Sequence, residues 1–484
     1  MDFVKSSAES DNMNNAVVIP KTDDDQTKFC LVEGGRIRLL APAGCGKTHS
    51  LLWRCLHLAK KSPLDKPKFL IFSFTRAARD ELRDRLIHQA DFEAIAPLVT
   101  VTTLNSWGYR YIKPRIRNLK LITDNRDRYL CMENLLQSVW SRYGRICSVL
   151  SDSRRKNQAC QTIMKLNDTL KSLGFRHDLI HSANDIQEHF THLIQCGMIS
   201  QIKALTDELK ELEIINGDKS PIEQIMVHYI GFWKKATILQ YQSAMLTLDD
   251  QKYWAWIELE KQLKQGQYTT GGGRYHHILV DEFQDINPLD LALLKAIAAI
   301  NKAELTLAGD DDQALYEWRG ATPSFILDPQ TYIGGKYKTC ILGTNYRSPR
   351  NIVELSQKLI THNKRRVNKN VAAASPNNAF VQVKRFPDIS GSTNFTLSLV
   401  QSLLNDKSIR NIALIGRKRS QIIPYQIIFA GQNIPFYAAE DLQVFLSDAF
   451  KQLQAILAIR ARAESSSILD LDPVNDLLKI LDYR

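Results

Sequence analysis

Small residues, a lysine and a hydroxyl occur together in one short run near the N-terminus. The run consists of Ala41, Pro42, Ala43, Gly44, Cys45, Gly46, Lys47 and Thr48. Small residues allow the backbone N–H groups of a tight turn to point at phosphate oxygens. The lysine can reach the β- and γ-phosphates, and the threonine hydroxyl can ligate Mg²⁺. The run therefore predicts a nucleotide-binding loop, with Ala41 where the usual pattern has its first glycine.

A pair of carboxylates follows an apolar run much later in the chain. Asp281 and Glu282 come directly after residues 278–280, which read as a buried strand. Open α/β sheets bind their ligands at the edge where the strands end. Nucleotide hydrolysis needs one carboxylate in the Mg²⁺ shell and one that orients or deprotonates water. Asp281 suits the first role and Glu282 the second, so the pair complements the phosphate loop.

These side chains need a sheet to position them, and strand patterns occur on both sides of a helical stretch. Strand-like runs are found at residues 37–40, 69–74, 98–101, 278–280 and 305–308, and a further α/β segment from about residue 340 has predicted strands near 380–386 and 412–415. Strands that alternate with helices indicate a parallel sheet with helices on both faces. Residues from about 110 to 245 hold few strand signals, which predicts an inserted, mostly helical domain.

The composition restricts the class of protein. A chain of 484 residues corresponds to about three domains, and its net charge of +11 favours a polyanionic partner. The eight cysteines include no CxxC pair, which is typical of reduced thiols in a cytosolic protein. No apolar run approaches the ~18 residues of a membrane span, and the N-terminus lacks a secretory signal pattern. We therefore predict a cytoplasmic protein with no membrane contact.

The run GDDDQALYEWRGA at residues 309–321 carries a family resemblance. It closely resembles the third motif of the UvrD/Rep family of superfamily-one DNA helicases. Further stretches resemble other motifs in the family's order, with Asn105 where histidine is usual. These stretches are residues 74–78, 103–106, 248–250 and 345–348. At motif level the resemblance covers roughly residues 26–109 and 245–460.

The resemblance implies an α/β fold with a RecA-like P-loop NTPase parallel sheet, a helical insertion and a partial second RecA-like domain. The expected division is a flexible lead-in (1–25), a first motor domain in two parts (26–109 and 246–330), an inserted helical domain (110–245), an incomplete second motor domain (331–463) and the start of a truncated segment (464–484).

The resemblance also implies roles at a site that binds ATP and Mg²⁺. Gln26 lies where the family keeps an adenine-reading glutamine, and Tyr346 would stack on the adenine. Gln313 would sense the γ-phosphate and couple it to the DNA site. Arg347 would act as an arginine finger from the second motor domain.

A single-strand DNA channel is the other site that the resemblance implies. Its residues would be Phe74, Thr75, Thr103, Tyr316, Trp318 and Arg319. Aromatic faces hold any base without reading sequence, while cations follow phosphates. Alternatively, Trp318 is a core aromatic and the two threonines are ordinary strand-end residues. The expected partners are single-stranded DNA and duplex junctions, with movement from 3′ to 5′.

The family's fifth and sixth motifs are absent from the chain, and with them a second arginine finger. We therefore expect weak DNA-stimulated ATPase from the chain alone, because losing one cation finger costs roughly 10³-fold in rate. Three interpretations stay open. The chain is the N-terminal portion of a helicase, a nucleotide-gated DNA-binding subunit completed by a protein partner, or a truncated product.

Overall fold

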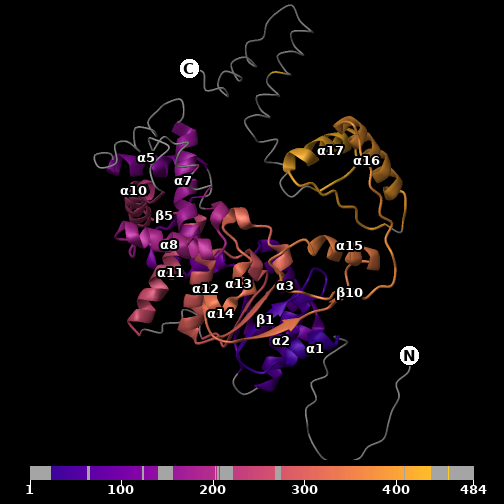
Figure 1. Ribbon diagram of the computed structural model, residues 1–484, viewed down its shortest axis with the longest axis horizontal. Coiled ribbons are helices and arrows are strands. Elements are labelled where there is room, and N and C mark those ends of the chain that lie inside the picture. Colours follow the sequence, from indigo (N-terminus) through magenta and orange to yellow (C-terminus); the bar gives the residue numbers. More distant parts are fainter. Residues whose placement is uncertain are drawn as a thin grey trace, which may run out of the picture. The chain divides into compact units, whose positions relative to one another are not determined.

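The computed structural model of the chain forms two compact units, Met1–Ala379 and Phe380–Arg484, which we describe separately (Figure 1). The structure describes residues 23–62, 66–122, 125–139, 156–201, 203, 207, 222–266, 274–407, 409–437 and 456. Almost all of the predicted lead-in and the whole of the predicted segment 464–484 lie outside the described residues.

A six-stranded parallel sheet forms the centre of the first unit. In spatial order its strands are β3 (Val99–Thr102), β2 (Phe69–Phe72), β6 (His277–Val280), β7 (Glu304–Gly309), β1 (Arg36–Leu40) and β8 (Tyr337–Ile341). Five of these strands confirm the runs predicted from the sequence. The sixth, β8, pairs with β1 and comes from the range assigned to the second motor domain.

The first unit also contains a short parallel pair formed by β9 (Thr344–Asn345) and β10 (Ala372–Ala373). Helices surround the central sheet and supply most of the rest of the unit. They are α1 (Asp24–Leu31), α2 (Lys47–Lys61), α3 (Arg76–His88), α4 (Leu104–Ile112), α5 (Asn125–Val139), α7 (Lys156–Ser172), α8 (Ala183–Gln195), α10 (Ile222–Gln242), α11 (Leu248–Lys264), α12 (Pro288–Asn301), α13 (Ser324–Leu327), α14 (Pro329–Ile333) and α15 (Arg350–Ile360). Short 3₁₀ turns are η1 (Ala90–Leu98), η2 (Lys113–Arg115), η3 (Phe283–Asp285), η4 (Asp311–Gln313) and η5 (Glu317–Arg319).

Both faces of the sheet are buried, as the apolar strands predict. Successive strand residues point to opposite faces, and β2 shows this directly. Its Leu70 and Phe72 join one hydrophobic cluster, while Phe69 and Ile71 join the other. Helix α2 covers one face and helices α11 and α12 cover the other. The α/β fold with a parallel sheet is therefore confirmed.

Two short strands, β4 (Lys120–Leu121) and β5 (Met245–Leu246), pair in parallel. The chain between them contains helices α5, α7, α8 and α10. No sequence pattern indicates this pair of strands, because two residues are too few to show a period. A buried ion pair of 2.5 Å joins Lys171 of α7 to Asp250 of α11. One hydrophobic cluster also contains Ile163 of α7, Tyr229 of α10 and Ile278 of β6, so the helical region shares one core with the sheet.

The described part of the second unit holds helices α16 (Ile389–Leu404) and α17 (Arg419–Gly431). The strands predicted near residues 380–386 and 412–415 are not found, since no strand is assigned anywhere in the described residues from 380 to 437. A strand needs a hydrogen-bonded neighbour, and sequence pattern alone does not provide one. Phe380 is 90% exposed and Ile415 is 88% exposed.

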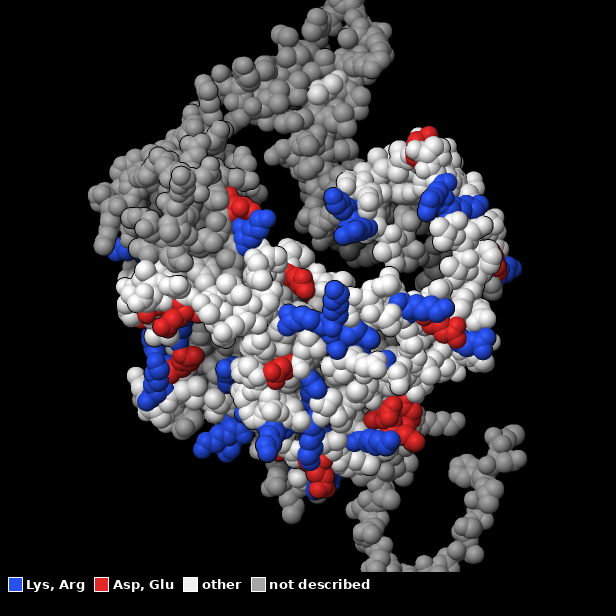
Figure 2. Space-filling model, viewed as in Figure 1, with Lys and Arg blue, Asp and Glu red and all other residues white. Residues whose placement is uncertain are grey.

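Charged side chains are interspersed on the face drawn in Figure 2, with Lys and Arg lying among Asp and Glu. The net charge of +11 therefore does not form a single basic patch on that face. No helix among the described residues is long and apolar enough to cross a bilayer.

Candidate nucleotide and nucleic-acid sites

The phosphate loop connects β1 to the N-terminus of α2. Gly44 and Gly46 both have a φ of +78°, a backbone conformation that residues with a side chain rarely adopt. A Cβ on Gly46 would also lie 2.6 Å from Nε2 of Gln26. The turn therefore needs glycine at both positions. Helix N-termini favour anions, because their first N–H groups have no helical partner.

Lys47 meets the two carboxylates that follow β6. Its Nζ lies 3.3 Å from Oδ1 of Asp281 and also forms an ion pair with Glu282. The Thr48 hydroxyl donates to Oδ2 of Asp281 over 3.3 Å. The structure thus brings together two pairs of adjacent residues that are 233 positions apart in the sequence, because β1 and β6 end at the same edge of the sheet.

Burial and charge act in opposite directions on these groups. Burial lowers the pKa of Lys47, but the charges of Asp281 and Glu282 outweigh burial and raise it above its usual range. Burial raises the pKa of Asp281, and Lys47 offsets this only in part. Burial would raise the pKa of Glu282 as well, but Lys47 and a bond from Gln284 hold it below its usual range. Glu282 is therefore the carboxylate of the pair that is held ionised.

Gln26 and Tyr346 lie at the same loop. Gln26 is buried, and its Nε2 donates to the carbonyl of Cys45 over 3.1 Å. Tyr346 is half exposed, and its hydroxyl donates to Oδ2 of Asp23 over 2.7 Å. Asp23 in turn caps α1 by accepting from the Gln26 amide. One amide and one exposed aromatic ring therefore stand beside the phosphate loop.

The segment after β8 packs directly on this loop. Nδ2 of Asn345 donates to the carbonyl of Ala43 over 2.7 Å, and Oδ1 of Asn345 accepts from the Arg347 amide. A Cβ added to Gly44 would lie 2.7 Å from Cβ of Arg347. Arg347 is exposed and contributes to the lowered pKa of Glu282. The arginine therefore lies on the nucleotide side of the sheet.

Gln313 does not reach the acidic pair itself. Its Nε2 donates to Oδ2 of Asp310 over 2.7 Å. A different glutamine makes the link: Nε2 of Gln284 donates to Glu282 over 2.8 Å, and its Oε1 accepts from the Asp310 amide over 3.0 Å. Sequence reasoning assigned no role to Gln284. Its only signal was its place two residues after Glu282.

Four of the residues expected to contact DNA form one cluster. The rings of Phe74 and Tyr316 have centroids 5.1 Å apart, and Trp318 lies 6.5 Å from Tyr316. The Arg319 guanidinium lies 5.7–5.9 Å from all three rings. Trp318 is 77% exposed, so it is not a core aromatic. The cluster forms a stacking surface flanked by a cation.

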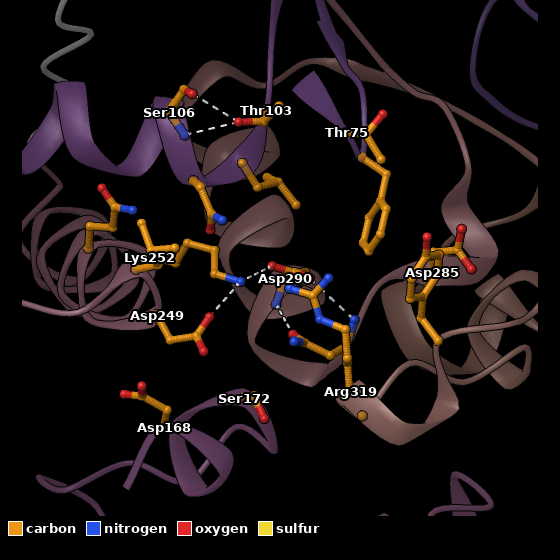
Figure 3. Close-up of a pocket in the computed structure, with 18 of the residues that line it drawn as sticks. Thr75, Thr103, Ser106, Asp168, Ser172, Asp249, Lys252, Asp285, Asp290 and Arg319 are labelled. Carbon is orange, nitrogen blue, oxygen red and sulfur yellow. Dashed lines mark hydrogen bonds and ion pairs between the residues drawn. The ribbon is translucent and has the colours of Figure 1, made fainter. Parts of the chain in front are cut away.

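This cluster lines a cleft of about 870 Å³ in the first unit (Figure 3). Thr75 and Thr103 also line it, and each caps a helix: Thr75 accepts from the Ala78 amide of α3, and Thr103 from the Ser106 amide of α4. A phosphate in the cleft would therefore meet two helix N-termini as well as threonine hydroxyls.

The other side of the cleft is acidic, which the sequence did not indicate. Lys252 bonds to Asp249 over 3.0 Å and to Asp290 over 2.8 Å, as Figure 3 shows. Asp168 and Asp285 also line the cleft. Burial, followed by the charge of Glu282, raises the pKa of Asp285 to about 7.

The sheet, the phosphate loop and the acidic pair at the carboxyl edge define a RecA-like P-loop fold. Residues 22–332 match the UvrD/REP helicase N-terminal domain, and residues 340–472 match the UvrD-like helicase C-terminal domain. The chain therefore belongs to the UvrD/Rep helicase family.

Several curated relatives are similar over most of this chain. A probable DNA helicase II homolog of Mycoplasma capricolum is 24% identical over 93% of the chain and 57% of its own length. The putative ATP-dependent DNA helicase YjcD of Bacillus subtilis is 26% identical over 87% of the chain and 49% of its own length. The ATP-dependent DNA helicase PcrA of Staphylococcus epidermidis is 23% identical over 92% of the chain and 54% of its own length. The chain thus spans about half the length of these relatives.

Proposed function

We propose that this protein hydrolyses ATP with Mg²⁺ and uses the energy to move along single-stranded DNA and open duplex junctions. The proposal rests on the loop that follows β7, because this loop reaches both sites. Asp310 and Gln313 lie at the nucleotide end of this loop, and Tyr316 and Trp318 lie at its other end, in the cleft. A change at the nucleotide can therefore act on the DNA surface through a few residues.

At the nucleotide, Lys47 would neutralise phosphate charge, and Thr48 and Asp281 would hold Mg²⁺. The Thr48 hydroxyl and the Asp281 carboxylate lie in contact, as joint ligands of one ion would. When bound, Mg²⁺ neutralises charge on the transferred phosphoryl group. Glu282, which is held ionised, would orient the attacking water and accept its proton as phosphoryl transfer proceeds.

Gln26 and Tyr346 would hold the adenine, and Arg347 would approach the γ-phosphate. The amide of Gln26 is fixed by the loop carbonyl, while the half-exposed ring of Tyr346 would stack on the base. Arg347 rests on Gly44, close enough to influence Glu282. A cation in this position stabilises charge that develops during phosphoryl transfer.

In the cleft, Phe74, Tyr316 and Trp318 would stack on bases, with Arg319 on the phosphates. Stacking accepts any base, so we expect little sequence preference. The relatives named above as ATP-dependent DNA helicases support this substrate. Movement from 3′ to 5′ is part of the proposal.

ATP hydrolysis measured with and without a poly-dT oligonucleotide tests the proposal. We expect weak DNA-stimulated turnover that Lys47→Ala abolishes, and Glu282→Gln should bind ATP without hydrolysing it. Nucleotide and DNA binding with no turnover in the wild-type chain would instead favour a nucleotide-gated subunit that requires a partner. Absence of both kinds of binding would refute the assignment of the two sites.

A further inference from the structure

A buried lysine outside the nucleotide site contacts three consecutive carboxylates. Nζ of Lys369 lies 3.0 Å from Asp310, 2.5 Å from Asp311 and 2.9 Å from Asp312. Lys369 is 6% exposed. These carboxylates belong to the loop after β7, whereas Lys369 follows α15. The contact therefore joins two segments that the proposed mechanism treats separately.

Neighbouring residues strengthen this contact. Arg366 makes a bidentate pair with Asp312, with both closest distances at 2.9 Å. The Val367 amide donates to Oδ2 of Asp311 over 2.9 Å. Residues 363–369 therefore hold the loop through charges and through the backbone.

The three carboxylates need a cation. Their oxygens lie within 4.8 Å of one another, a spacing at which a metal ion could bridge them. The Lys369 ammonium already occupies that position, and its three N–H donors can serve one carboxylate each. Burial lowers the pKa of Lys369, but Asp310 and its neighbours outweigh burial and raise it, so the ammonium stays charged.

Asp310 connects Lys369 to the nucleotide site. One of its carboxylate oxygens contacts Lys369 and the other accepts from Gln313. Its backbone amide donates to Gln284, which in turn donates to Glu282. A continuous series of polar contacts therefore runs from Lys369 to the carboxylate that faces Lys47.

We propose that Lys369 is a positioning residue for ATP hydrolysis. It fixes the loop 310–313, and through that loop Gln313 and Glu282, in the arrangement that turnover needs. The same contact ties the nucleotide site to the segment that leads into the second unit at Phe380. This inference rests on the function proposed above.

Four variants of the full chain test the proposal. Lys369→Met removes the cation, Lys369→Arg keeps it, and Lys364→Met changes an exposed lysine of the same segment. The fourth, Lys369→Met with Asp311→Asn, removes one positive and one negative charge, so the net charge of the cluster is unchanged. ATPase kcat and KM are measured with and without poly-dT, alongside thermal unfolding.

We expect Lys369→Met to lower kcat by about 10–100-fold while KM changes little, since small misplacement of reacting groups costs this much. Lys369→Arg should recover part of the loss, and Lys364→Met should match wild type. The double variant should regain thermal stability but not kcat. Full recovery of kcat in the double variant, or wild-type kcat in a folded Lys369→Met, would overturn the proposal.

Hydrogen exchange of the amides at 310–313 gives a readout that does not need turnover. We expect faster exchange there in the charge-balanced double variant than in wild type. Unchanged exchange would overturn the proposal even if the chain hydrolyses no ATP. A wild-type chain without ATPase but with the expected exchange would count against the proposed function only.

Discussion

The backbone N–H of Tyr346 donates a hydrogen bond to the carbonyl of Gly44 over 2.9 Å. Asn345 makes a second bond to the same loop, at Ala43. The phosphate loop is therefore braced by a segment some three hundred residues later in the chain. Its shape depends on both parts, and a change in either should affect nucleotide binding.

Gly44→Ala tests this bracing. The new Cβ would lie 2.7 Å from Cβ of Arg347, and φ is already +78°. We expect a loss of about 2–4 kcal/mol in the free energy of unfolding, from backbone strain and overpacking together. ATP affinity should fall as well. Denaturant unfolding and nucleotide titration measure the two effects.

Gly266→Ala is the matched control, because φ there is +65° and nothing lies within 4 Å of the added Cβ. It should cost only about 1 kcal/mol. Equal losses in the two variants would show that Arg347 does not brace the loop.

Gln284→Leu should break the hydrogen-bonded bridge that Gln284 forms between Glu282 and Asp310. The Asp310 amide would lose its acceptor and Glu282 would lose a donor. We expect a loss of about 1–3 kcal/mol in stability, the usual penalty for an unpaired buried group, together with slower ATP turnover. Gln330→Leu, at an exposed glutamine of α14, should change neither. Wild-type turnover in Gln284→Leu would contradict a role for the bridge.

Stability should depend on pH through Asp285. Its pKa is raised from 3.8 to about 7, so the folded state holds this proton more tightly than the unfolded state. The resulting stabilisation is complete below about pH 4 and is lost as the pH rises through about 7. Asp285→Asn removes the buried charge, and we expect it to be about 2–4 kcal/mol more stable than wild type at pH 8.

Denaturant unfolding between pH 4 and pH 8 measures this difference. The exposed carboxylate Asp84 of α3 provides a control, since Asp84→Asn should follow the wild-type curve. If the curves of stability against pH for wild type and Asp285→Asn are parallel from pH 4 to pH 8, Asp285 does not titrate in this window.

Trp318→Ala should weaken single-stranded DNA binding without affecting folding. The ring is 77% exposed, so little core packing is lost, while one stacked base is worth about 1–3 kcal/mol. Leu315→Ala is a matched control, because that side chain is 76% exposed and carries no ring. Fluorescence anisotropy of a labelled poly-dT measures both affinities. An equal loss in both variants would argue against stacking at Trp318.

Local patterns in the sequence were enough for the parallel sheet, the phosphate loop and the family. Strands β2 and β6 are continuous apolar runs, and Gly44 to Thr48 form an uninterrupted motif. Such features depend on neighbours in the chain, so they can be read without a fold. The predicted strands near 380–386 and 412–415 failed for the opposite reason, because a strand also needs a partner.

The contacts that connect the motifs to one another depend on how the chain packs. Gln284 and Lys369 belong to no motif, and the motif that begins at Asn345 does not indicate that this side chain contacts the phosphate loop. These residues join the acidic pair, the loop 310–313 and the phosphate loop. Their partners lie on other strands or in other segments, and distance along the chain does not predict which strand ends meet. The residue types in the motifs therefore determine which chemistry is available. The packing of the strands and loops determines which of these residues contact one another, because it brings the segments that carry them to one edge of the sheet.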